Sequence, residues 1–107
     1  MSLSENASAK SYPKISAFND HVYVAWNVED PFNTGTNKGV FFISSSDNGT
    51  TFGNVSKLNT EENGFGKPQV AAGYDNTVYV IWGGSSENQV SSIYLVKSDD
   101  NGRNFMT

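Results

Sequence analysis

Short runs of β-branched and aromatic residues alternate with turn-forming residues along the chain. Such runs on both sides of a short segment containing Asn or Asp are typical of β-hairpins. No stretch of ten or more residues has the 3.6-residue period of a helix. The pattern therefore predicts an all-β chain with two hairpins, Ile15–Phe18 with Val22–Val28 and Val70–Tyr74 with Val78–Trp82.

Each hairpin is followed by a longer loop and a third strand-like run. In the first half, loop Glu29–Lys38 leads to the run Val40–Ile43, and Val55–Asn59 is predicted as a fourth strand. In the second half, loop Gly83–Ser91 leads to the run Ile93–Val96. The two halves therefore have the same predicted order of strands.

The halves also match residue by residue. Val22-Tyr23-Val24-Ala25-Trp26 corresponds to Val78-Tyr79-Val80-Ile81-Trp82, and insertions between matched segments fall in the predicted loops. Four short antiparallel strands per repeat of about 50 residues describe one blade of a β-propeller. We expect residues 1–107 to form a single propeller segment of two four-stranded antiparallel blades, from repeats of about 1–55 and 56–107.

A motif of the form Ser-x-Asp-x-Gly-x-x-Phe occurs once in each repeat, directly after the third strand. The Ser and Asp side chains can bond to the backbone of the turn, and the Gly supplies a positive φ. The Phe is expected to pack back against the sheet and to anchor the turn. The structural residues of the motif are Ser45, Asp47, Gly49 and Phe52 in the first copy, and Ser98, Asp100, Gly102 and Phe105 in the second.

These two motifs resemble the Asp box, also called the bacterial neuraminidase repeat, in which the last position is Trp and sometimes Phe. With the preceding strands, the resemblance covers nearly the whole chain. It implies a sialidase-like β-propeller, in which each box links the third and fourth strands at the periphery, away from the catalytic centre. The family includes sialidases, other glycosidases, sorting receptors and cell-surface proteins, so the resemblance indicates architecture rather than one activity.

A sialidase site of that family would need three arginines, a tyrosine–glutamate pair and an aspartic acid. This chain has one arginine, Arg103, inside the second motif. We therefore assign no catalytic residue and expect a non-catalytic module that binds a glycan or a protein at the cell exterior. Two alternatives stay open: a fragment of a sialidase-type glycoside hydrolase whose catalytic residues lie in other blades, and a purely structural repeat.

Composition and charge exclude several other classes of partner. The chain has no cysteine and a net charge of −4, without the basic stripe that nucleic-acid phosphates require. No apolar run approaches the length of a membrane span, so membrane insertion is not expected. The acidic segment Ser98–Asn101 lacks the spacing of a calcium loop. We therefore expect no metal site and no cofactor.

Aromatic residues at equivalent positions are interpreted as packing residues. Trp26 and Trp82, with Tyr23 and Tyr79, are expected to pack between adjacent blades, because identical residues in both repeats suit a core better than a site. His21, the only histidine, is interpreted as a solvated residue of the hairpin turn. Two isolated blades would expose apolar faces, so we expect a homo-oligomer or a part of a longer repeat array.

Overall fold

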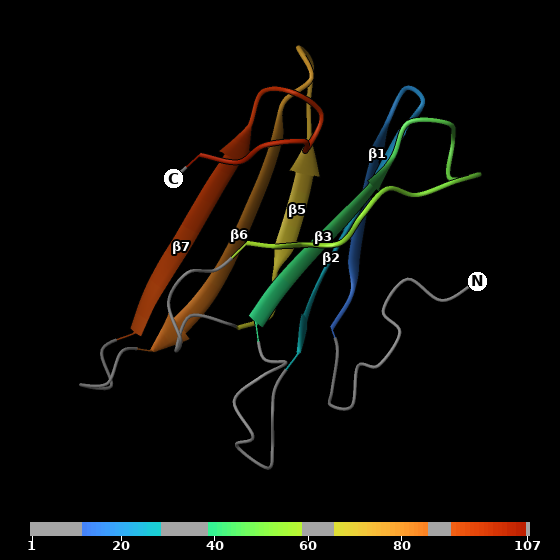
Figure 1. Ribbon diagram of the computed structural model, residues 1–107. Coiled ribbons are helices and arrows are strands. Elements are labelled where there is room, and N and C mark those ends of the chain that lie inside the picture. Colours follow the sequence, from blue (N-terminus) through green and yellow to red (C-terminus); the bar gives the residue numbers. More distant parts are fainter. Residues whose placement is uncertain (1–11, 29–38, 59–65, 86–90, 107) are drawn as a thin grey trace.

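The computed structural model describes residues 12–28, 39–58, 66–85 and 91–106, and these residues form two antiparallel β-sheets (Figure 1). No helix occurs among them, and hence none of the described residues forms a helix that could cross a membrane. The all-β prediction is confirmed for this part of the chain. The strands are β1 Lys14–Phe18, β2 His21–Val28, β3 Gly39–Ser45 and β4 Ser56–Lys57 in the first sheet, and β5 Gln69–Ala72, β6 Val78–Ser85 and β7 Ser91–Ser98 in the second.

Neighbouring strands of each sheet are consecutive in the sequence. In the first sheet the order is β1-β2-β3-β4, and the β1–β2 hairpin turns at Asn19, whose φ is 55°. In the second sheet the order is β5-β6-β7, and Lys97 of β7 forms an isolated bridge with Met106. The equivalent bond in the first sheet is donated by the Gly53 N–H to the Ser44 carbonyl. Both sheets are therefore built as simple meanders.

Several predicted boundaries differ from the structure. The predicted loop Gly83–Ser91 is wrong at both ends, because β6 continues to Ser85 and β7 begins at Ser91. Gly83 pairs with Ile93 in this extension, since ladder bonds use backbone groups and need no side chain. The run predicted as Val70–Tyr74 ends at Ala72, because the Gly73 N–H closes the turn onto the Thr77 carbonyl. The fourth strand predicted as Val55–Asn59 is limited to Ser56–Lys57, and the second sheet has three strands among the described residues where four were predicted. Loop Glu29–Lys38 and Asn59 lie outside the described residues.

Alternation along the strands gives each sheet two apolar faces, which we name after their aromatic residues. The Tyr face consists of Tyr23, Ala25, Val40 and Phe42 in the first sheet and of Tyr79, Ile81, Ile93 and Leu95 in the second. The Trp face consists of Val24, Trp26, Phe41 and Ile43 in the first sheet and of Val80, Trp82, Tyr94 and Val96 in the second.

The core between the sheets joins unlike faces. The Tyr face of the first sheet packs against the Trp face of the second sheet, with Val78 added from the start of β6. Trp82 stacks on Tyr94 within this core, and Trp26 stacks in the same way on Phe41 in the first sheet. Both tryptophans are buried, as expected, but only Trp82 lies between the two sheets. Trp26 belongs to a second cluster with Val28 and Ile43 on the opposite face of the first sheet.

Candidate functional site

The first motif turn, Ser45–Phe52, is held by the hydroxyl of Ser45, the last residue of β3. This hydroxyl donates to Asp47 Oδ1 at 2.7 Å and accepts from the N–H groups of Asp47 and Gly49 at 3.2 and 2.9 Å. Ser45 is buried, so these bonds satisfy a polar group that water does not reach. The buried Ser45 hydroxyl thus bonds to three groups of the turn and stabilises it.

The carboxylate of Asp47 binds the far side of the same turn. Its Oδ1 accepts from the Thr51 N–H at 2.8 Å, and its Oδ2 accepts from the Thr51 hydroxyl. The bonds from the side chain and backbone of Thr51, with that from Ser45, lower the pKa of Asp47 to about 2. The turn therefore holds Asp47 ionised at neutral pH.

The second motif turn, Ser98–Phe105, has the same pattern of hydrogen bonds. The Ser98 hydroxyl donates to Asp100 Oδ1 at 2.7 Å and accepts from the Gly102 N–H at 2.8 Å. Asn104 replaces Thr51, and its backbone N–H and side-chain amide both donate to Asp100 at 2.9 Å. The bonds from Ser98 and Asn104 lower the pKa of Asp100 to about 2.

Two consecutive residues of each motif turn have a left-handed backbone. The φ angles are 61° and 84° at Asn48 and Gly49, and 61° and 85° at Asn101 and Gly102. The positive φ expected of the two glycines is confirmed. No role of the asparagines was predicted from the sequence, although Asn tolerates this conformation better than other residues with a Cβ.

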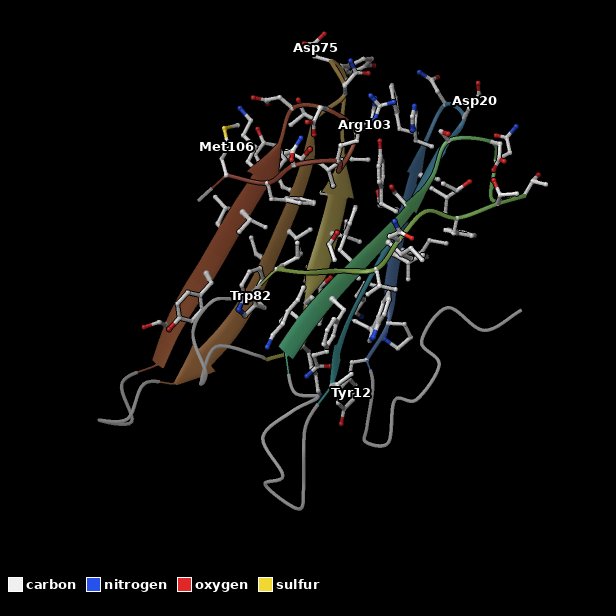
Figure 2. All side chains as sticks on the ribbon, in the orientation of Figure 1. Tyr12, Asp20, Asp75, Trp82, Arg103 and Met106 are labelled. Carbon is white, nitrogen blue, oxygen red and sulfur yellow. The ribbon has the colours of Figure 1, made fainter. Side chains whose placement is uncertain are left out.

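These asparagines also tie each motif turn to the hairpin of its own sheet. The N–H of Asn48 donates to the Asp20 carbonyl at 2.9 Å, and the N–H of Asn101 donates to the Asn76 carbonyl at 2.9 Å. The two motif turns and the two hairpin turns therefore gather at one end of the molecule, where Figure 2 shows Asp20, Asp75 and Arg103. We call this part of the molecule the turn end.

The phenylalanines of the two motifs pack on different clusters. Phe105 packs against the core between the sheets and meets the ring of Phe42 edge-on, with centroids 4.8 Å apart. Phe52 packs against the cluster of Trp26 and Ile43 on the outer side of the first sheet. Each ring covers the Trp face of its own sheet, in agreement with its expected role as an anchor.

A cleft of about 570 Å³ opens at the turn end between the two motif turns. A smaller cavity of about 250 Å³ adjoins it between the two hairpin turns and shares His21 and Asn101 with it. The residues that line the larger cleft come from three places in the sequence: His21; Ser44, Ser46, Thr51–Asn54 and Ser56; and Asn101–Arg103. Only Phe52 and Gly102 of these were named as motif residues from the sequence.

His21 is not the solvated turn residue that the sequence suggested. It is the first residue of β2, is half-buried, and its ring lies parallel to that of Tyr23 with centroids 5.9 Å apart. The Tyr23 hydroxyl donates to Asn101 Oδ1 at 3.0 Å, and burial raises the pKa of Tyr23. His21, Tyr23 and Asn101 are therefore in contact one after the other, and His21 and Asn101 both line the cleft.

Metal-binding chemistry finds no support in the described ranges. No group of three His, Asp, Glu or Cys side chains lies close enough there to hold an ion. Asp99 pairs with Lys97 at 3.4 Å, while Asp100 is occupied by its own turn. The acidic segment after β7 is therefore explained by turn chemistry.

Comparison of the chain with protein-family models, with curated protein sequences and with solved structures finds no match in any of the three.

Proposed function

We propose that the chain forms two blades of a sialidase-like β-propeller and acts outside the cell as a non-catalytic module that binds a glycan or a protein. The observation that carries this proposal is the cleft at the turn end, because residues from both repeats line it. Its volume of about 570 Å³ lies within the range of about 300–1,000 Å³ that is common for small-molecule sites. The propeller assignment is supported by the matched meanders and the two matched motif turns.

The chemistry of the cleft suits a polar, hydroxyl-rich ligand. Asn54 offers an amide, Asn101 offers the N–H2 of its amide, Ser46 offers a hydroxyl, and Arg103 adds a positive charge. Phe52 and His21 add ring surfaces, and a ring face can pack against the apolar side of a sugar. The same groups also suit a polar loop of a protein.

Binding is favoured over hydrolysis by the residue types in this cleft. Glycosidases of the common type use two carboxylates across the scissile bond. Among the described residues, the lining of the larger cleft includes no Asp or Glu. The smaller cavity includes Asp20 and Asp75, which lie in the two hairpin turns and do not line the larger cleft.

The proposal is tested with an array of neutral and acidic oligosaccharides, followed by NMR titration of the bound sugar. We expect shifts at cleft residues, and R103A and N54A should each weaken binding about fivefold or more, as loss of a hydrogen bond of about 1 kcal/mol does. K14A is the matched control, because it removes a positive charge from the exposed start of β1. If no glycan or protein loop binds, or if R103A and N54A bind as tightly as the unchanged chain, the cleft is rejected as the site. Turnover of a fluorogenic sialoside would reject the non-catalytic assignment.

A further inference from the structure

The outer face of the second sheet has four large apolar side chains open to solvent, with the Lys97 ammonium 6.0 Å from the Tyr79 ring on the same side. Its Tyr face consists of Tyr79, Ile81, Ile93 and Leu95, which are 41%, 40%, 81% and 52% exposed. The equivalent residues of the first sheet are all at most 2% exposed. An exposed apolar surface of this kind marks an interaction site.

The internal core shows which surface covers a Tyr face. The Tyr face of the first sheet is covered by a Trp face, that of the second sheet, and the two form one buried cluster. Because the second sheet has the same alternation, we expect its own Tyr face to be covered by a Trp face as well. Among the described residues, the Trp face that packs against no Tyr face belongs to the first sheet, although its Trp26, Val28 and Ile43 are already buried in a cluster of their own.

The first sheet has a matching open region on that side. Ile15 of β1 is 69% exposed, whereas its equivalent Val70 packs half-buried against the core between the sheets. Trp26 and Ile43 are already buried, so a new contact here would be made along β1 and by the half-buried Phe41 and Phe52. β1 is the right strand for this, because its equivalent β5 is the strand of the second sheet that lies closest to β1 and β2.

A polar pair occurs at the same two surfaces. Inside the molecule, the Tyr23 hydroxyl donates to Asn101 Oδ1 across the boundary between the sheets. The equivalent residues are both exposed: Tyr79 lies on the outer Tyr face of the second sheet, and Asn48 lies in the first motif turn. Asn48 already has the backbone conformation of Asn101, with φ 61° at both. A Tyr79 hydroxyl could therefore meet Asn48 of a neighbour as Tyr23 meets Asn101.

We propose that a second copy of this chain docks head to tail, with the open β1 side of its first-sheet Trp face and Asn48 against the second-sheet Tyr face and Tyr79 of the first copy. The contact places β1 of one copy where β5 lies in the internal packing, and it joins two different surfaces. Such an interface leaves one free surface of each kind at the ends, so it grows into a ring where the rotation between copies closes and into an open chain where it does not. This inference goes beyond the proposed ligand binding, since only Phe52 belongs both to one of these surfaces and to the cleft, and the variants that test the contact change no cleft residue.

The test is sedimentation velocity on the full chain over a wide concentration range. We expect association that depends on concentration, weakened at least tenfold by I93E on one surface and by I15E on the other. Both residues are largely exposed, so circular dichroism should show folded variants. An equimolar mixture of I93E and I15E should recover a species of two chains, because each variant keeps the surface that the other has lost.

Smaller changes test the polar pair. Y79F and N48G should each weaken association several-fold, and together no more than either alone, if the two groups bond to each other. Y74S is the control, because Tyr74 is exposed at a hairpin turn, lies on neither surface, and makes its ring contact with Phe18 within the same chain. A monomer at every concentration overturns the proposal. So does a dimer that I93E breaks and I15E leaves intact, which would mean like faces pairing.

Discussion

The two sheets have the same apolar pattern but differ in burial. At four equivalent positions the first sheet has core residues and the second sheet has surface residues, and Ala25 is even replaced by the larger Ile81. The difference arises because the first sheet has a neighbour on its Tyr face and the second has none among the described residues. The repeat thus encodes the chemistry of a face, while its burial depends on what packs against it.

The two motif turns differ in the same way. Their internal hydrogen bonds are matched, but their surroundings are not. A Cβ on Gly102 would lie 2.6 Å from Cε2 of Phe42, whereas a Cβ on Gly49 would meet only Cγ2 of Val22 at 3.8 Å. The second motif turn therefore packs closely against Phe42 of the first sheet, whereas the first motif turn has no such close neighbour at the equivalent glycine.

The largest expected effect separates the two Tyr faces. F42A should lower the free energy of unfolding by about 3–5 kcal/mol, because it empties a fully buried position next to Phe105. L95A, at the equivalent exposed position, should change it by less than about 0.5 kcal/mol. Urea unfolding at concentrations where the chain is monomeric measures both. Equal losses would mean that Leu95 is also part of a core.

A smaller effect separates the two motif turns. G49A should cost about 1–2 kcal/mol, because φ at this position is 84° and the cost is that of a left-handed backbone alone. G102A should cost about 1–3 kcal/mol more, because the added methyl also collides with the buried ring of Phe42. The same unfolding experiment gives both values. A difference near zero would show that Phe42 moves aside freely.

The smallest effect concerns acid, and here the two motif turns should behave alike. The pKa of Asp47 and of Asp100 is about 2 in the folded chain, below the value of 3.8 of an ordinary aspartate. A depressed pKa adds stability above about pH 3.8, and this stability is lost as the pH falls toward 2. The midpoint of urea unfolding should therefore fall over this window.

The matched variants are D47A and D100A. Each should lower the midpoint at neutral pH and flatten its acid dependence to a similar extent. The effect is modest because solvent screens carboxylates at the surface. An unchanged slope in both variants would place the acid sensitivity elsewhere in the chain.

Much of the fold could be predicted from local pattern. The hairpins, the third strands and the motif turns follow from β-branched runs, from Asn and Asp between them, and from Gly at positive φ. The ends of β6 and β7 could not, because Gly83 and Gly84 indicate a turn locally and join the ladder only when a partner strand is present. His21 was misplaced for the same reason, since pairing with Phe18 extends β2 into the expected turn.

The candidate site was predictable only in part. The residues that hold each motif turn are neighbours in sequence, so their hydrogen bonds could be inferred from spacing. The cleft joins His21, the segment around Asn54 and Arg103, which are far apart in sequence and meet only when the sheets pack. The asparagines with positive φ gave a usable signal, because the same residue precedes the glycine in both motifs.

Apart from the ends of β6 and β7, the main strands and the two motif turns follow from the amino-acid order, because they depend on local alternation and on hydrogen bonds within a few residues. Which faces meet, which tyrosine is buried and where the cleft opens follow only from the packing of the sheets. This is so because burial is a property of pairs of surfaces. Tyr23 and Tyr79 occur in nearly the same sequence, and only the sheet packed against Tyr23 makes one a core residue and the other a surface residue.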